Sequence, residues 1–209
     1  MKKGKVYIVG AGPMDEGLIT VKGVEYLNMA DVVLYDRLVN RRFLKYVRKD
    51  VEAIYVGKSR NKKVPQNKIN HLLIKKALEG KTVVRLKGGD PFLLGRGPEE
   101  ALALKQAGIR FEVVSGVSSA FAVPGYAGIP PTFRGISSAV TVVTGQEDPF
   151  KKQPSVKWNK IYNPDITIVI LMGMANLSKI IDRLISLKAK RSVPIAVIQE
   201  GTTPYQKVV

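Results

Sequence analysis

The stretch VYIVGAGPMDEG, residues 6–17, runs an apolar segment into a glycine turn. A dinucleotide-binding fingerprint requires Gly-x-Gly-x-x-Gly at such a turn, and counting from Gly10 and Gly12 puts Asp15 where the third glycine belongs. Pro13 also lacks the backbone N–H that a pyrophosphate would use, and the acidic residues after it add negative charge. The stretch therefore predicts a strand and a turn that approach a ligand without a phosphate.

Short apolar runs alternate with helical patterns on the C-terminal side of this turn. The runs are nearly continuous in apolar residues, which is typical of parallel strands covered by helices on both faces. The fold class is therefore predicted to be α/β. The expected strands are residues 5–9, 31–35, 52–56, 82–86 and 110–114, and the expected helices are residues 18–30, 40–48, 66–78 and 98–107.

The texture of the sequence changes after Ser115, where small residues and prolines become frequent. We place a domain boundary near Val114, which gives an N-terminal α/β domain, residues 1–114, and a C-terminal α/β domain, residues 115–209. The chain stops at an apolar, strand-like run, which predicts that the C-terminal domain is truncated at its end. The elements expected in this domain are strands over 139–145, 166–173 and 193–199, a helix over 177–187 and a long connection over 146–165.

Composition limits the classes of function. The chain has 209 residues, no cysteine and one histidine, which excludes a disulfide framework and the usual zinc sites, so no metal is expected. No apolar stretch reaches the roughly 18 residues of a membrane span, and the N-terminus lacks a signal-peptide core with a cleavage site, so we predict a cytoplasmic protein. The net charge of +17 indicates an anionic partner: a nucleic acid, a membrane surface or a polycarboxylate substrate.

A second glycine motif, LKGGDPFLLGRGPEE, covers residues 86–100. It follows an expected strand and so lies at a carboxyl end, where open α/β sheets bind their ligands. The paired glycines let a ligand touch the backbone, and Asp90 can accept hydrogen bonds from hydroxyl or ammonium groups. A plain Gly-Asp turn is the alternative. The other glycine turn, at residues 10–13, favours the ligand-binding interpretation.

Two ionisable residues also follow expected strands. Asp36 comes directly after residues 31–35, and Lys58 comes shortly after residues 52–56, so both would project from the same rim of the sheet. A carboxylate and an ammonium group there could handle a proton from opposite sides of one substrate. For Asp36, a helix N-cap or a salt bridge is an equally simple explanation.

Three further candidates also have structural explanations. Ser118 and Ser119 open an expected helix, where they could cap the helix or hydrogen-bond a ligand. Met172 looks like a core residue in its sequence context, because methionine fills irregular gaps. The residues alone leave these alternatives open.

The chain resembles the tetrapyrrole methyltransferase family over nearly its whole length. The resemblance implies a fold of two α/β domains with an active-site cleft between them, S-adenosyl-L-methionine as methyl donor, S-adenosyl-L-homocysteine as product, and a homodimer. YDRLV and VGKSR are most similar to members that methylate uroporphyrinogen III at two positions to give precorrin-2, in sirohaem and cobalamin biosynthesis. The methyl donor has no phosphate and carries a positive sulfonium, which fits the first glycine turn. The motifs that carry the resemblance are, in order, VGAGPMDEGLITVKG, ADVVLYDRLV, VGKSR, LKGGDPFLLGRGPEEA, SGVSSAFAVPGYAGIPPTFRG, VTVVTG, LMGMANL and QEGTTPYQ.

The resemblance also implies roles for single residues. Asp36 would be the proton acceptor and Lys58 the proton donor. The candidates for binding the carboxylates of the tetrapyrrole are Arg37, Arg41, Arg96 and Arg134. The implied cofactor contacts are Pro13, Gly88, Gly89, Asp90, Leu93, Ser118, Ser119, Met172 and Gly201.

The chain departs from the family pattern at four positions, and none of them removes a proposed catalytic group. These are Met14, where glycine is common, Ser115, where proline is common, and Phe133 and Gln146, where histidine is frequent.

Two rival functions stay open: methyl transfer to another tetrapyrrole precursor, and nucleic-acid binding by a basic protein. Against the second, the basic stretch over residues 37–63 lacks interleaved exposed aromatic residues and matches no groove-reading motif. The expected partner is therefore a small-molecule tetrapyrrole, with no nucleic acid and no membrane.

Overall fold

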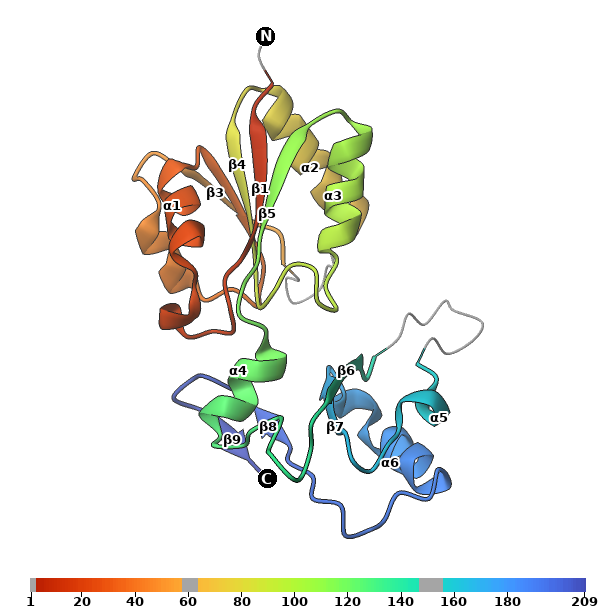
Figure 1. Cartoon of the computed structure of the whole chain (residues 1–209). Helices are drawn as coiled ribbons and strands as arrows, with labels where there is room; N and C mark the ends of the chain where they lie inside the picture. The colour runs from red at the N-terminus through yellow and green to blue at the C-terminus, as the bar shows by residue number, and fades with distance from the viewer. Residues whose placement is uncertain (1–2, 58–63, 147–155) are drawn as a thin grey trace. The chain divides into compact units, whose positions relative to one another are not determined.

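A computed structural model of the chain describes residues 3–57, 64–146 and 156–209 (Figure 1). The chain divides into two compact units. Unit 1 comprises Met1–Ser119 and Thr202–Pro204, and unit 2 comprises Ala120–Gly201 and Tyr205–Val209. A short segment near the C-terminus therefore belongs to the unit that the N-terminal half of the chain builds.

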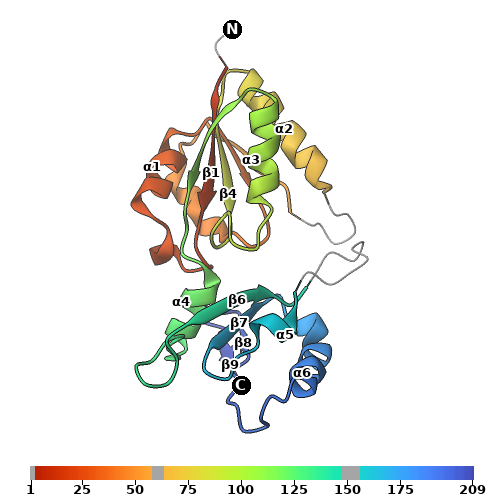
Figure 2. The ribbon, with the colours of Figure 1, turned by 45° about the vertical axis from the view of Figure 1, so that its right-hand side comes forward.

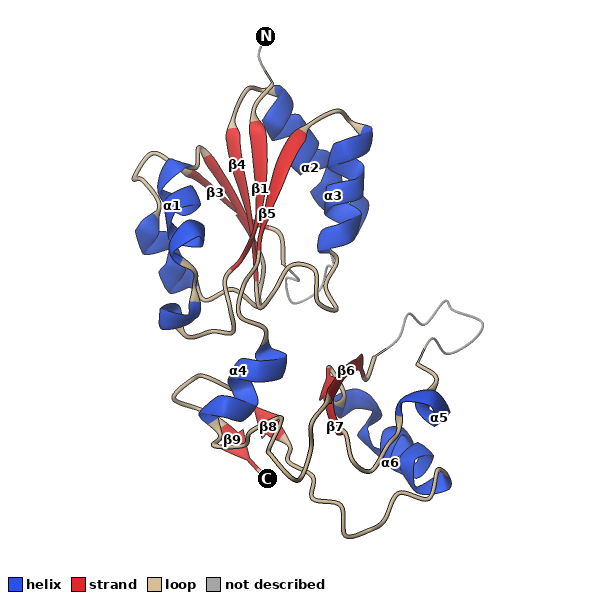
Figure 3. Cartoon of the chain, viewed as in Figure 1, coloured by secondary structure: helices blue, strands red, loops and turns tan. Residues whose placement is uncertain are grey.

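Unit 1 is built on a five-stranded sheet with the strand order β3-β2-β4-β1-β5 (Figure 3). All its neighbouring strands are parallel, which confirms the predicted α/β fold class. Each strand agrees with its predicted range to within a residue at either end. The strands are β1, Lys5–Gly10; β2, Val32–Tyr35; β3, Glu52–Tyr55; β4, Thr82–Lys87; and β5, Arg110–Val114.

Helices cover both faces of this sheet, with α1 on one side and α2 and α3 on the other (Figure 2). On the second face, Ile8 of β1 belongs to one buried apolar cluster with Leu73 and Leu104. On the first face, Val9 belongs to another cluster with Leu27. Successive side chains of a strand point to opposite faces, so burial on both sides requires continuous apolar strands. The helices are α1, Val21–Met29; α2, Gln66–Leu78; and α3, Gly97–Gln106, with short 3-10 helices η1, Glu16–Leu18, and η2, Arg41–Tyr46.

The helix predicted over residues 40–48 is present, and it is the 3-10 helix η2 rather than an α-helix. The Asn40 side chain accepts a hydrogen bond from the Arg42 N–H at its start, and the Val47 N–H donates to the Leu44 carbonyl at its end. Among its residues only Phe43 is buried. One anchoring side chain and tight i→i+3 bonds favour a short 3-10 helix over a longer α-helix.

Unit 2 contains a two-stranded parallel sheet of β6, Val140–Thr144, and β7, Thr167–Leu171. Both strands and the following helix α6, Leu177–Ser186, lie where the sequence predicts them. The remaining elements are α4, Ser119–Tyr126, whose first residue belongs to unit 1; α5, Trp158–Ile161; η3, Met174–Asn176; β8, Ile198–Gln199; and β9, Lys207–Val208.

The strand predicted over residues 193–199 is wrong for most of its length, since only β8 is regular strand. Pro194 has no N–H to offer a ladder, which interrupts the run near its start. Pairing begins at Val197, which exchanges backbone hydrogen bonds of 2.7 and 3.0 Å with Val209. β8 and β9 continue this pairing in antiparallel register.

Candidate functional site

The turns after β1 and β4 pack backbone against backbone at the carboxyl end of the sheet. The Ala11 N–H donates to the Lys87 carbonyl over 2.7 Å, and Gly12 and Gly89 exchange N–H···O bonds of 3.3 and 2.9 Å. The carboxyl edge is where parallel α/β sheets bind ligands. The structure thus brings together the two glycine turns that the sequence singled out.

Glycine is required where these turns meet the segment after β5. A Cβ on Gly10 would lie 2.5 Å from the Gly116 nitrogen, and a Cβ on Gly116 would lie 2.3 Å from the Gly89 carbonyl oxygen. Gly89 itself has a positive φ of 65°, and apart from Gly89 and its two chain neighbours no heavy atom of the described residues lies within 4 Å of a Cβ built on it. The backbone at Gly89 is therefore open to a ligand, whereas Gly10 and Gly116 lie in close backbone contact that leaves no room for a side chain.

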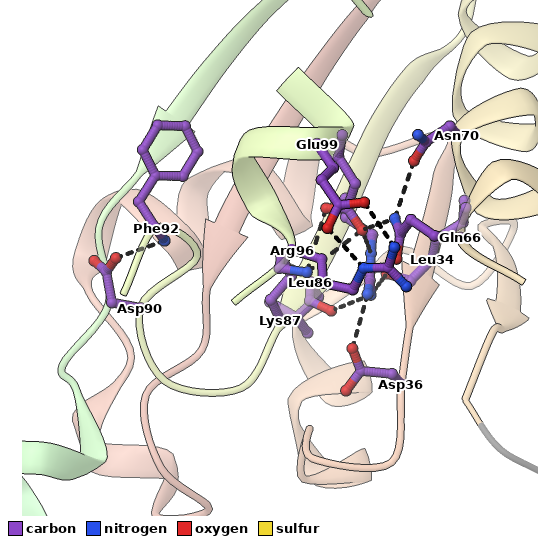
Figure 4. Close-up of polar contacts among 12 residues, drawn as sticks. Leu34, Asp36, Gln66, Asn70, Leu86, Lys87, Asp90, Phe92, Arg96 and Glu99 are labelled. Atoms are coloured by element: carbon purple, nitrogen blue, oxygen red, sulfur yellow. Dashed lines mark hydrogen bonds and ion pairs between the residues drawn. The ribbon is translucent and has the colours of Figure 1, made fainter. Parts of the chain in front are cut away.

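Asp90 ties the β4 turn to the segment after β5. Its Oδ1 accepts hydrogen bonds from the Phe92 N–H over 2.8 Å (Figure 4) and from the Leu93 N–H over 3.2 Å. Its Oδ2 accepts from the Gly116 N–H over 3.2 Å. The simple Gly-Asp turn expected as the alternative is thus present. The same bonds fix a carboxylate beside the open backbone of Gly89.

The loop after β1 is held by two side chains that the sequence reasoning missed. The buried Thr202 hydroxyl donates to the Pro13 carbonyl over 2.9 Å, and the Asn40 side-chain amide donates to the Met14 carbonyl over 2.7 Å. Met14 and Thr202 both have positive φ, 26° and 65°, which is uncommon for residues other than glycine. Such conformations persist only where the surrounding structure holds them in place, and they are found most often at functional sites.

Asp36 follows β2 at the same carboxyl edge and forms a salt bridge. Its Oδ2 accepts a hydrogen bond from Nη2 of Arg85 over 2.8 Å, and its Oδ1 accepts from the Leu38 N–H over 3.1 Å. Figure 4 labels Asp36 at the edge of this group of polar side chains. The Asp36 side chain is 24% exposed, whereas that of Arg85 is 3% exposed. The salt-bridge explanation of Asp36 is therefore correct, and the carboxylate still reaches solvent.

Arg85 belongs to a buried cluster of charged side chains between the sheet and α3. Its Nε donates to Oε1 of Glu100 over 3.0 Å, and the Lys87 ammonium lies 3.3 Å from Oε2 of the same carboxylate. Burial lowers the pKa of Arg85, but the charges of Glu100 and Asp36 outweigh burial and raise that pKa above its usual value. Burial lowers the pKa of Lys87, and the positive charge of Arg85 lowers it further. We call Asp36, Arg85, Lys87 and Glu100 the charge cluster.

Part of the charge cluster can be recognised in the sequence, from the alternation of side chains along strand β4. Alternate residues of a strand share a face, so Arg85 and Lys87 lie on the face of the buried Val83. In the parallel register Leu34 pairs with Arg85, so Asp36, two residues on, lies close enough for the arginine side chain to reach it. Two cations inside an apolar strand need buried anions, and the partners become evident only once the register is known.

The arginine candidates of unit 1 lie at or near this edge with different partners. Arg37 is exposed beside Asp36. The Arg41 guanidinium lies 5.7 Å from the centre of the Tyr55 ring. Arg96 forms a two-point ion pair with Glu99, with distances of 2.8 and 2.6 Å. Lys58 lies outside the described residues.

The remaining candidates lie at the start of α4 and in unit 2. Ser119 is the first residue of α4, and Ser118 directly precedes it. Met172, just after β7, is 53% exposed with a φ of 59°, so it is not a core residue. A Cβ on Gly201 would lie 2.4 Å from the Val123 side chain, so this position requires glycine. Arg134 is exposed in a turn of unit 2.

Within residues 3–57, 64–146 and 156–209, no group of three or more His, Cys, Asp or Glu residues could hold a metal ion. No helix in the same ranges is long and apolar enough to cross a membrane.

A parallel sheet with helices on both faces and packed glycine turns at its carboxyl edge defines an α/β protein. The chain belongs to the tetrapyrrole (corrin/porphyrin) methylases, whose family model matches residues 5–209.

Individual relatives agree with this membership. A protein of Methanocaldococcus jannaschii named uroporphyrinogen-III C-methyltransferase is 51% identical over 208 residues, which are 99% of this chain and 85% of that protein. A Bacillus subtilis protein of the same name is 48% identical over 100% of this chain, which spans only 44% of that relative's length. The crystal structure of uroporphyrin-III C-methyl transferase from Thermus thermophilus complexed with S-adenyl homocysteine matches with a TM-score of 0.83 and 36% identity, over 99% of this chain and 82% of that one.

Proposed function

We propose that this chain transfers methyl groups from S-adenosyl-L-methionine to two carbon atoms of uroporphyrinogen III, giving precorrin-2 for sirohaem or cobalamin biosynthesis. The observation that carries the proposal is the 51% identity, over 99% of the chain, to a relative named for this reaction. The carboxyl edge of unit 1 supports it, because glycine turns and a carboxylate meet there.

The residues around Gly89 fit a cofactor that lies against the backbone. Gly10 and Gly116 leave no room for side chains, and the space beside Gly89 is open among the residues described. When bound, S-adenosyl-L-methionine supplies an electrophilic methyl group on a positively charged sulfonium and leaves as S-adenosyl-L-homocysteine. We expect it to be held by Pro13, Gly88, Gly89, Asp90, Leu93, Ser118, Ser119, Met172 and Gly201.

Methylation of a pyrrole carbon leaves a proton that must be removed to restore conjugation. Asp36 is suited to accept it, because its side chain is partly exposed and its two oxygens are fixed by Arg85 and by the Leu38 N–H. We assign the proton-donor role to Lys58. The carboxylates of the tetrapyrrole would pair with Arg37, Arg41, Arg96 and Arg134, since guanidinium groups bind carboxylates at two points.

The proposed reaction is tested by incubating the protein anaerobically with uroporphyrinogen III and S-adenosyl-L-methionine and measuring the mass of the recovered tetrapyrrole. We expect a gain of two methyl groups, and an Asp36→Asn variant that binds S-adenosyl-L-homocysteine normally but turns over about 100-fold or more slowly. Methylation of precorrin-2 or a later precursor in place of uroporphyrinogen III would reassign the substrate within the family.

We further propose a homodimer in the cytoplasm, on the family resemblance. Sedimentation velocity across a range of concentrations distinguishes a dimer from a monomer. A monomer at all concentrations would refute the proposed assembly without affecting the proposed reaction.

A further inference from the structure

Arg85 is held in one orientation by every nitrogen of its guanidinium. Nε donates to Glu100 over 3.0 Å and Nη2 donates to Asp36 over 2.8 Å. Nη1 donates to the Leu86 carbonyl over 2.8 Å and lies 3.4 Å from the Leu34 carbonyl. Because the fork is rigid and planar, fixing these bonds fixes the direction from which Asp36 is held.

Glu100 is the buried anchor of this arrangement. It lies in the first turn of α3 and its side chain is fully buried. The Gln66 side-chain amide, from the first residue of α2, donates to its Oε1 over 3.1 Å, and the Lys87 ammonium lies 3.3 Å from its Oε2. The charge cluster, with two positive and two negative groups, therefore connects the end of β2 with β4 and α3, and Gln66 links it to α2.

Such a cluster is not explained by stability. The residues before it on the same face of the sheet are apolar and buried, such as Ile8, Leu34 and Val83. Taking charges out of water is costly, and well-packed apolar side chains of similar size are often as stabilising or more so. What apolar side chains cannot do is fix the orientation of a carboxylate at the edge of the sheet.

The geometry points to Arg85 and Glu100 as positioning residues that aim the Asp36 carboxylate for proton removal. This inference rests on the proposed methyl transfer. Glu100 orients Arg85, and Arg85 orients Asp36, so neither residue needs to touch the tetrapyrrole. A misplacement of about 1 Å in a reacting group can slow a reaction about 100-fold.

The decisive variant replaces the buried charges together. In R85M/K87M/E100M the three side chains become apolar groups of comparable length, and the charge that stays in the cluster is the partly exposed Asp36 carboxylate. We expect this protein to melt at or above the wild-type temperature and to bind S-adenosyl-L-homocysteine with unchanged affinity. The turnover number should fall about 100-fold with little change in the KM for the tetrapyrrole.

Two further variants separate positioning from folding. Arg85→Lys keeps the charge but cannot reach both carboxylates, so it should fold and still lose about tenfold or more in turnover. Adding the three methionines to Asp36→Asn should cause no further loss, because both act on one step. The control is D31N/R48M, which removes an ion pair at the opposite end of β2 and should retain full turnover.

The outcomes distinguish this inference from the proposed function. An absence of methylated product with the wild-type protein refutes the proposed function itself. Full turnover of R85M/K87M/E100M or of Arg85→Lys, beside an inactive Asp36→Asn, overturns the positioning role alone. Further loss on adding the methionines to Asp36→Asn would also overturn it.

Discussion

Strand β2 has an aspartate at each end, and the two differ in what surrounds them. Asp31, before the strand, accepts a hydrogen bond from Nη2 of Arg48 over 3.0 Å, and both side chains are more than a third exposed, at 48% for Arg48 and 35% for Asp31. Asp36, after the strand, pairs with Arg85, which is buried and held by Glu100. The aspartate–arginine pair at the amino end of β2 is therefore exposed to solvent, whereas the arginine of the pair at the carboxyl end is buried in the protein.

The difference shows what each pair can do. An exposed ion pair contributes little to the stability of the fold, because water competes for both charges and the two side chains lose conformational freedom. A buried pair restricts orientation, at a cost in desolvation. Loss of the exposed pair at the amino end should therefore change stability little. At the carboxyl end, removing any single member of the charge cluster should change stability or the orientation of Asp36.

The largest expected effect is on stability at the carboxyl end. Glu100→Ala leaves Arg85 and Lys87 buried without their shared anion, so the free energy of unfolding should fall by about 3–5 kcal/mol. Asp31→Ala, at the amino end, should lower it by only about 1–2 kcal/mol, since it loses an exposed pair and one backbone hydrogen bond from Thr82. Urea denaturation of both variants measures the difference, and equal losses would contradict the contrast between the two ends.

Two glycine-to-alanine substitutions distinguish a glycine needed for backbone packing from one needed for ligand binding. In Gly4→Ala, at the amino end, the added Cβ would lie 1.9 Å from the Lys81 carbonyl oxygen, and relieving this contact should cost about 1–3 kcal/mol of stability. In Gly89→Ala the Cβ enters open space, and the positive φ costs about 1–2 kcal/mol.

Binding of S-adenosyl-L-homocysteine should rank these two variants in a different order. Gly89→Ala should weaken binding tenfold or more, equivalent to about 1.4 kcal/mol, while folded Gly4→Ala binds as the wild type does. Calorimetric titration measures both affinities. Normal binding by Gly89→Ala would remove the backbone at Gly89 from the proposed cofactor site.

Asp31→Asn should be a mild change that leaves catalysis intact. The amide can still accept the Thr82 N–H bond but loses the charge that pairs with Arg48, so stability should fall by about 1 kcal/mol or less. Turnover should equal that of the wild type. A loss of turnover comparable to that of Asp36→Asn would mean that the two ends of β2 are not independent.

The smallest effect is a pH dependence from another partly exposed cluster. The hydrogen bond from Lys22, followed by those from Lys5 and Tyr26, lowers the pKa of Glu112 to about 2. Because the folded pKa lies below the usual 4.5, Glu112 contributes stability above about pH 4.5 and loses it as the pH falls toward 2. The gap in urea midpoint between wild type and Glu112→Gln should therefore be larger at about pH 6 than at about pH 3. A gap that widens on acidification would contradict this sign.

Much of the fold could be predicted from the sequence, because each strand of unit 1 is a continuous apolar run between turn residues. The hydrophobic pattern did not predict the type or length of two elements, which depend on individual residues. Asn40 and a single buried phenylalanine limited residues 41–46 to a 3-10 helix. Pro194 confined the pairing of a second apolar run to its last residues.

The site divides in the same way. Glycine spacing and the position of Asp36 after a strand identified the carboxyl edge, because parallel strands of one sheet end at one edge. Arg85 and Thr202 could not be assigned from the sequence, because their partners lie far away along the chain: Asp36 is 49 residues from Arg85, and Pro13 is 189 residues from Thr202. Glu100 is closer, 15 residues from Arg85, but the two meet only because α3 packs on the sheet.

The sequence by itself determined the α/β class, the strands of the sheet and the two glycine turns at its carboxyl edge, since these follow from local hydrophobic period and backbone chemistry. The tertiary structure alone decided which charges share a buried cluster. Strand register and helix docking bring Asp36, Arg85 and Glu100 within hydrogen-bond distance, and neither can be read from residues that are neighbours only in sequence.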